Sequence, residues 1–171
     1  FVLNTISLPD HTSAFVFADE LKSDRKFILE AAKRGCDIDI EFFDEKLVSD
    51  REIVLAQLEN SYRGILGELV GSGKKLTRDR EIVLAAVKKD GCSLKYADEK
   101  LKAEREVVMA AIRENGEAIS YADDELKADR EIVLAAVKLW EGALEYADEK
   151  LKSDREIFIA VIRQNPLALQ H

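Results

Sequence analysis

A chain of 171 residues with 47% hydrophobic side chains is long enough to bury a core, which excludes disorder as its default state. Charged residues make up 35% of the chain, more than the roughly 25% of an average domain, and this favours an extended body over a compact ball. Its formal net charge of -8 disfavours nucleic acid, and its aliphatic runs of at most six residues fall far short of the roughly 18 of a membrane span, so we expect neither partner.

Six triplets, each an acidic residue followed by Arg and then Glu or Lys, divide the chain at regular intervals. Their arginines lie 26, 29, 25, 25 and 25 residues apart. The triplets are Asp24-Arg25-Lys26, Asp50-Arg51-Glu52, Asp79-Arg80-Glu81, Glu104-Arg105-Glu106, Asp129-Arg130-Glu131 and Asp154-Arg155-Glu156. An aliphatic run follows each triplet, and a second, amphipathic block follows that run. This period is the signature of a repeat architecture.

We interpret residues 1–171 as a single repeat domain. Its first part, residues 1–23, is a partial or degenerate unit, and its last part, residues 154–171, is a partial unit. The complete units between them are 24–49, 50–78, 79–103, 104–128 and 129–153. Because the chain has no initiator Met and begins inside a hydrophobic pattern, we expect it to be a fragment of a larger protein.

Each unit is predicted to form two helices. The first begins at the triplet, where Ser49 and Glu52 have the spacing of a capping box, as have Ser153 and Glu156. It is predicted to end about eleven residues later, near a glycine in the left-handed conformation such as Gly91 or Gly116. The second helix carries Leu94, Ala97 and Leu101 on one apolar stripe.

The first helix is apolar nearly all round in its middle, so a single unit of 25 residues cannot cover it. Neighbouring units that stack in register can do so. We therefore predict an all-α fold, an α-solenoid of two-helix repeats in which right-angle or antiparallel hairpins stack into an elongated superhelix.

The units resemble a known family. The stretch LKADREIVLAAVK followed by ALEYADEKLKSDREI, residues 126–138 and 143–157, closely resembles the tandem helical repeat called domain of unknown function 4116. The resemblance extends over essentially the whole chain, although residues 4–17 and 62–75 lose the pattern. It implies a tandem helical fold and brings neither an activity nor catalytic residues.

The glycine-rich stretch at residues 64–73 invites comparison with a phosphate-binding loop. Such a loop needs a Gly where this chain has Glu68 and a hydroxyl where it has Lys75, so both positions fail. The unit that contains it is instead four residues longer than the 25-residue units that follow it. Inserted loops can carry a binding function, and we therefore take Tyr62, Arg63, Lys74 and Lys75 as candidate interaction residues.

No cofactor, metal site or catalytic constellation is predicted. The two histidines, His11 and His171, lie at opposite ends of the chain. Cys36 and Cys92 lie two units apart, which at about 10 Å per helix layer is too far for a disulfide. Both are therefore predicted to be free thiols, which favours an intracellular reducing compartment.

The six repeated arginines allow two interpretations. They could form a ladder that grips an anionic ligand. Each Arg, however, follows an acidic residue and in five cases precedes a Glu, which favours helix capping and ion pairs between adjacent units.

The role of Trp140 also allows two interpretations. It replaces the polar residues Asp90 and Asn115 of other units, so it is either an exposed interaction residue or a lid over the altered turn at Glu141-Gly142. The tyrosines Tyr96, Tyr121 and Tyr146 recur at one position, where packing between units is favoured over base stacking.

Three functions remain. The first is a non-catalytic scaffold that binds a protein or peptide on its extended face. The second is binding of an anionic ligand or nucleic acid through the arginine ladder, and the third is an accessory role for an enzyme elsewhere in a larger chain. The fragment could also self-associate end to end, because its two ends would expose faces that otherwise meet another unit.

Overall fold

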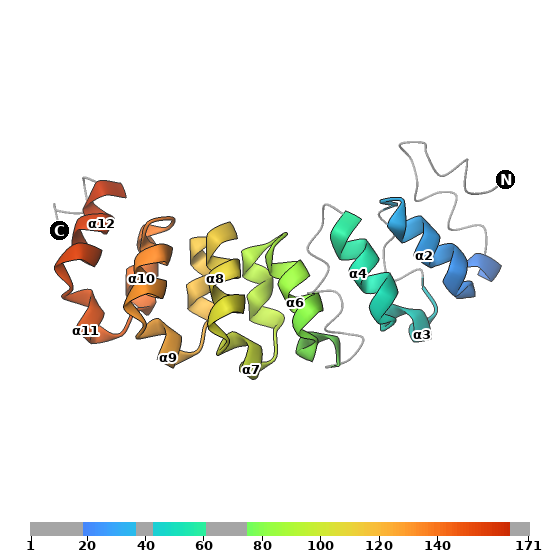
Figure 1. The fold of residues 1–171 in the computed structure, drawn as a ribbon, viewed down its shortest axis with the longest axis horizontal. Helices are drawn as coiled ribbons and strands as arrows, with labels where there is room; N and C mark the ends of the chain where they lie inside the picture. The colour runs from blue at the N-terminus through green and yellow to red at the C-terminus, as the bar shows by residue number, and fades with distance from the viewer. Residues whose placement is uncertain (1–18, 37–42, 61–74, 165–171) are drawn as a thin grey trace.

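A computed structural model describes residues 19–36, 43–60 and 75–164, and the secondary structure of these residues is entirely helical. Six long helices lie side by side in chain order along the long axis of the molecule, and each contacts the next (Figure 1). They are α2 (Arg25–Lys33), α4 (Arg51–Asn60), α6 (Arg80–Val87), α8 (Arg105–Glu114), α10 (Arg130–Val137) and α12 (Arg155–Gln164). Each begins at the Arg of a triplet, as the sequence predicts.

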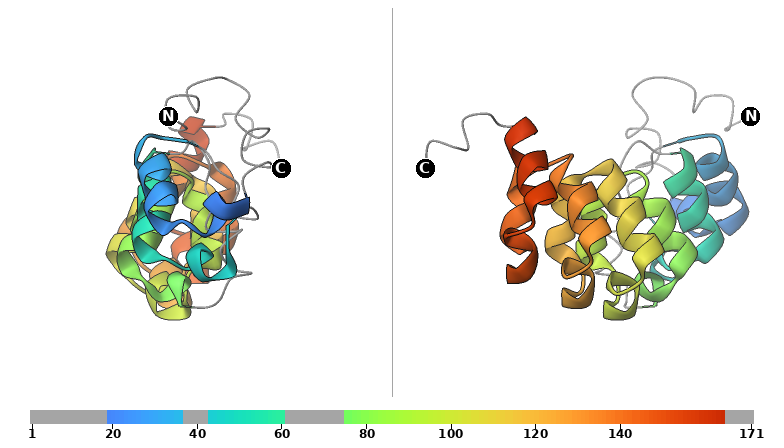
Figure 2. Two further views of the ribbon diagram at one scale, coloured as in Figure 1. Left: turned by 90° about the vertical axis from the view of Figure 1, so that its right-hand side faces the viewer. Right: turned by 60° about the vertical axis from the view of Figure 1, so that its left-hand side comes forward.

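A second layer of shorter elements joins the long helices. It contains 3-10 helices η2 (Asp19–Ser23), η5 (Leu76–Arg78), η6 (Gly91–Tyr96), η7 (Gly116–Tyr121) and η8 (Glu141–Tyr146), and one-turn helices α3 (Glu45–Val48), α7 (Glu99–Lys102), α9 (Asp124–Lys127) and α11 (Glu149–Lys152). The 3-10 helix η6 packs against both α6 and α8, and η7 packs against both α8 and α10. Viewed from one end, successive units line up behind one another (Figure 2).

The predicted second helix is wrong in one respect. Leu94, Ala97 and Leu101 are all buried as expected, but they do not lie on one continuous helix. Ala97 has an extended backbone (φ -66°, ψ 153°) that ends η6, and the Asp98 carboxylate then accepts a hydrogen bond from the Lys100 N–H to start α7. The block is therefore two short helices with a break between them, because Asp98 caps a new helix at that point.

The predicted role of the glycines is also corrected. Among the described residues only Gly35 has a positive φ, at 77°. A Cβ atom on Gly91 would lie 2.3 Å from the carbonyl oxygen of Ala111, and one on Gly116 would lie 2.8 Å from that of Ala136. Both glycines are needed because the 3-10 helix lies close to the backbone of the next long helix.

The helix caps differ from the predicted capping box by one residue. The Asp50 carboxylate, not the Ser49 hydroxyl, accepts hydrogen bonds from the backbone N–H groups at the start of α4, at 3.1 and 3.3 Å. The same holds for Asp154 in α12. Because these helices begin at the Arg, the residue immediately before it has the backbone position of the N-cap.

The core is a continuous row of aliphatic side chains between the units. In α6, Ile82, Val83, Ala86 and Val87 are completely buried, which confirms that this helix is covered on several sides. The corresponding residues of α8 and α10 are equally buried. Within the described ranges, no helix combines the length and the apolar character that crossing a membrane requires.

Candidate interaction surface

The repeated arginines tie neighbouring units together. Arg25 places its Nε 2.7 Å from the Asp50 carboxylate and its Nη2 2.8 Å from the Glu52 carboxylate, both in the next triplet. Four further arginines do the same: Arg51 pairs with Asp79 and Glu81, Arg80 with Glu104 and Glu106, Arg105 with Asp129 and Glu131, and Arg130 with Asp154 and Glu156. We call these five groups the arginine clamps. They confirm the prediction of ion pairs between adjacent units.

The clamps also fix the electrostatics of the triplets. The hydrogen bond from Arg25 lowers the pKa of Asp50 and of Glu52, and that from Arg130 lowers the pKa of Asp154. The acceptor carboxylates in turn raise the pKa of both arginines. Each clamp guanidinium therefore has two carboxylates beside it, and their negative charge disfavours an anionic ligand at the same place.

A second repeated feature lies on the outward face of the long helices. In α6 it consists of Glu81, Leu84, Ala85 and Lys88, whose spacing places them on one side of a helix. Glu81 and Lys88 are exposed, whereas Leu84 and Ala85 are half-buried against the core. These residues were not among the predicted interaction residues, although their spacing is visible in the sequence.

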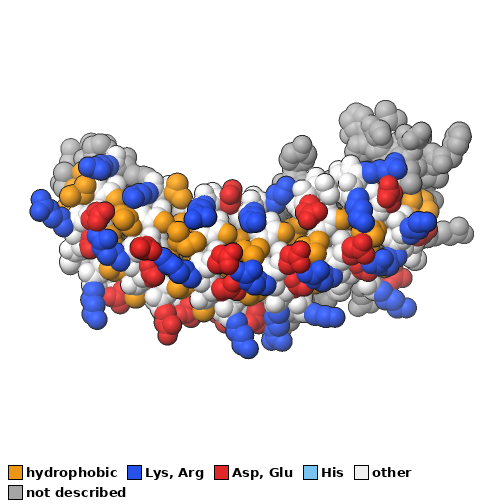
Figure 3. All heavy atoms as spheres, viewed as in Figure 1, with side chains coloured by type: hydrophobic (Ala, Val, Ile, Leu, Met, Phe, Trp, Pro, Cys, Tyr) orange, Lys and Arg blue, Asp and Glu red, His pale blue; other side chains and the backbone are white. Residues whose placement is uncertain are grey.

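The leucine position of this face recurs in every long helix. We call its members the apolar row: Leu29, Leu55, Leu84, Met109, Leu134 and Ile159. Figure 3 shows hydrophobic side chains in a broken line along this side of the molecule, with charged side chains on either side of it. The acidic edge of the row carries the arginine clamps, and exposed basic residues such as Lys88, Arg113 and Arg163 lie at the other edge.

Of the candidate residues from the inserted loop, Lys75 alone lies within the described residues. Tyr62, Arg63 and Lys74 lie outside the described residues. Lys75 is exposed just before η5. It precedes the N-terminus of α6, while Trp140 follows the C-terminus of α10 two units later, so these two residues lie at opposite ends of their long helices.

Trp140 covers the altered turn. Its indole is half-buried, lies 5.9 Å from the Tyr146 ring, and would be 2.4 Å from a Cβ atom on Gly142. Asp90 and Asn115 cap the 3-10 helices of their units with their side chains, whereas Trp140 makes no side-chain cap. The contacts support the packing interpretation, and a role of Trp140 in binding stays a prediction.

Both cysteines are free and half-buried, as predicted for the thiols. Burial raises the pKa of Cys36 and of Cys92, so neither has the low thiol pKa of a reactive nucleophile. Cys92 Sγ accepts a hydrogen bond from Asn115 Nδ2 at 3.2 Å, which joins two units. In the part of the chain that the structure describes, no three His, Cys, Asp or Glu side chains are grouped to hold a metal ion.

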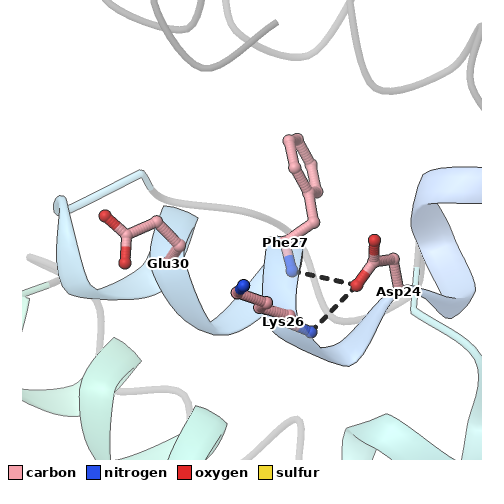
Figure 4. A pocket seen from close by; sticks show the side chains of 4 residues that line it. All are labelled: Asp24, Lys26, Phe27 and Glu30. Carbon is pink, nitrogen blue, oxygen red and sulfur yellow. Dashed lines mark hydrogen bonds between the residues drawn. The ribbon is translucent and has the colours of Figure 1, made fainter.

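A shallow pocket lies on α2, lined by Asp24, Lys26, Phe27 and Glu30 (Figure 4). The Asp24 carboxylate accepts hydrogen bonds from the backbone N–H groups of Lys26 and Phe27 at 3.0 and 3.1 Å, so it serves as the helix cap. Phe27 is half-buried where the other long helices have a completely buried Ile or Val.

Comparison with known proteins supports the repeat. Residues 79–127 and 129–171 each match the model of a family described as Domain of unknown function (DUF4116). Each matched segment contains two triplets, and together they cover more than half of the chain. The match is shorter than the nearly complete resemblance expected from the sequence. No curated protein and no solved structure matches the chain.

Proposed function

Since this chain belongs to the DUF4116 family, whose description names no activity, we propose from its own surface that it is a non-catalytic α-solenoid scaffold that binds a protein segment. The units would stack into an elongated superhelix, and the apolar row would be the binding face. The observation that carries this proposal is the repetition of one half-exposed apolar position on the outward face of successive long helices.

The chemistry of the face favours a peptide as the partner. A small-molecule site is concave and buries most of its ligand, whereas the apolar row is long and shallow. An extended peptide with three residues per turn advances about 9 Å per turn, which is close to the 8 to 10 Å between packed helices. Such a segment could place one apolar side chain beside each long helix.

The charges at the two edges of the apolar row favour a particular kind of protein segment. The carboxylates at the acidic edge are already paired with the arginine clamps, while Lys88, Arg113 and Arg163 at the other edge are exposed. A segment with acidic residues beside its apolar ones would therefore complement this face.

The alternative of an anionic ligand held by the arginine ladder has less support, because two carboxylates occupy each of the five clamp arginines. An accessory role for an enzyme elsewhere in a larger chain is compatible with a scaffold. The sequences of neighbouring domains would decide it.

Selection from a random peptide library displayed on phage tests the proposal without a known partner. We expect the 171-residue chain to enrich peptides with apolar and acidic residues. The variant Leu84→Gln, Met109→Gln and Leu134→Gln should bind the selected peptides at least about tenfold more weakly, because these side chains line the face.

A matched control places the same three substitutions at Ala103, Ala128 and Ser153, which are exposed and follow the one-turn helices. Circular dichroism and urea unfolding would show that both triple variants are folded. Peptides that bind the apolar-row variant as tightly as the parent chain, or a selection that enriches none, would refute the proposed face.

A further inference from the structure

The burial of the long helices shows which side of each faces which neighbour. Two adjacent positions after the Arg are completely buried in the middle of the row, as in Ile82 and Val83 of α6. At the first described helix the earlier position is Phe27, which is half-buried and packs against the core. At the last one the later position is uncovered, since Phe158 is 47% exposed. The later position thus faces the following unit.

The uncovered side of α12 therefore has the same types of residue as the buried contacts between units in the middle of the row. Phe158 is aligned with Ile28, Val54, Val83, Val108 and Val133, all of which are at most 1% exposed. Ile162, one turn further, is half-buried where Ile112 and Val137 are completely buried. Ile159 beside them is 38% exposed.

The positive charge of Arg155 on this side of α12 also has no counterpart in a described following unit. Arg155 is exposed and pairs with no carboxylate of the described residues, whereas the five preceding triplet arginines each hold two carboxylates of the next unit. We call Arg155, Phe158, Ile159 and Ile162 the terminal face. It presents a guanidinium beside an apolar strip. This is one half of the contact that joins each pair of adjacent units in the described structure.

We infer that the terminal face binds a helix that begins with an acidic residue, any residue and Glu, followed by Ile or Val. The two carboxylates would complete a sixth arginine clamp, and the aliphatic residue would cover Phe158. The inference rests on the stacking of units proposed above. It shares only Ile159 with the apolar row, and the apolar-row variant leaves Ile159 unchanged.

A head-to-tail second copy of this chain fits the terminal face less well. The first described triplet is Asp24-Arg25-Lys26, so Lys26 would replace the second carboxylate and place a positive charge near Arg155. The occupant is therefore a helix with the acidic start found in the later units, such as Asp129-Arg130-Glu131 of α10.

Fluorescence anisotropy of a labelled peptide copying residues 129–153, titrated with the 171-residue chain, tests this inference. We expect saturable binding that Arg155→Ala weakens about three- to tenfold, because it removes two exposed ion pairs. Changing Asp129→Asn and Glu131→Gln in the peptide should weaken binding by a similar factor. In the 171-residue chain, Lys150→Ala changes an exposed residue of α11 and should leave binding unchanged.

Because a short peptide must fold as it binds, a second measurement attaches the same segment to the C-terminus of the chain through a flexible glycine-serine linker. Tethering raises its effective concentration to the millimolar range. We expect the chain tethered to the unchanged segment to have a higher midpoint of thermal unfolding than the chain tethered to the segment with Asp129→Asn and Glu131→Gln. The apolar-row variant should behave like the parent chain, which separates this test from that of the proposed scaffold.

Several outcomes would overturn the inference. One is binding that does not depend on Arg155 or on the peptide carboxylates. Another is no binding together with equal midpoints for the two tethered versions. A third is self-association of the chain that the peptide does not inhibit, which would assign the face to a second copy. A chain ending at Gln164 that binds while the 171-residue chain does not would show that residues 165–171 occupy the face.

Discussion

Single residues at the contacts between units set how closely those units approach. Gly91 and Gly116 lie against carbonyl oxygens of the next long helix, so any side chain there would force the two units apart. Gly142 has a different neighbour, since the nearest atoms are those of the Trp140 ring. A backbone oxygen inside a helix cannot move without the helix, whereas an indole can rotate.

This difference predicts unequal effects of one added methyl group. Gly91→Ala should lower the free energy of unfolding by about 1 to 3 kcal/mol, because the Cβ atom would overlap Ala111 O. Gly142→Ala should cost less than about 1 kcal/mol, because Trp140 can rotate away. Urea unfolding at pH 7 measures both, and equal losses would show that the close backbone contact at Gly91 does not hold in solution.

At the scale of the element, each long helix begins at a cap that also belongs to an arginine clamp. Asp79 and Asp129 accept hydrogen bonds from two backbone N–H groups at the start of their helices and also pair with the Arg of the preceding unit. Glu104 pairs with Arg80 but makes no side-chain cap for α8. Its longer side chain reaches the Arg and leaves the helix N-terminus without that acceptor.

Glu104→Asp is therefore expected to stabilise the chain. The shorter carboxylate should cap α8 while still reaching Arg80, as Asp79 does with Arg51, and so raise the free energy of unfolding by about 0.5 to 1 kcal/mol. The reverse change, Asp129→Glu, should lower it by a similar amount. Thermal and urea unfolding of the two variants check this, and a destabilising Glu104→Asp would contradict the assigned role of the cap.

At the scale of the whole molecule, the units form a row in which consecutive long helices are neighbours (Figure 1). No described unit covers its own long helix alone, since the 3-10 helix of one unit packs against the long helix of the next. Stability should therefore be shared along the row and lowest at its ends.

An elongated shape in solution is the corresponding prediction. A compact protein of 171 residues would have a radius of gyration of about 15.5 Å, and we expect X-ray scattering to give about 18 to 22 Å. A dilution series would separate this value from end-to-end association, which should fall as the concentration falls. A concentration-independent value near that of a compact globule would refute the extended arrangement.

The sequence by itself determined the repeat, the starts of the long helices and the pairing of charges between units. Arg25 and Arg130 pair with the carboxylates of the next triplet because the period brings equivalent helix N-termini side by side. It also determined that the middle of each long helix is apolar on several sides, since the spacing of aliphatic residues on a helix decides this. These features depend on residue type and period, both of which the chain displays directly.

Only the tertiary structure decided the details that depend on the distance between units. The break at Ala97, the close contact at Gly91 and the position of the Trp140 ring over Gly142 all arise where two units meet. The outward position of the apolar row and the uncovered side of α12 are also properties of the stack. A local pattern shows that a helix has several apolar sides, but which side a neighbour covers depends on how the units pack.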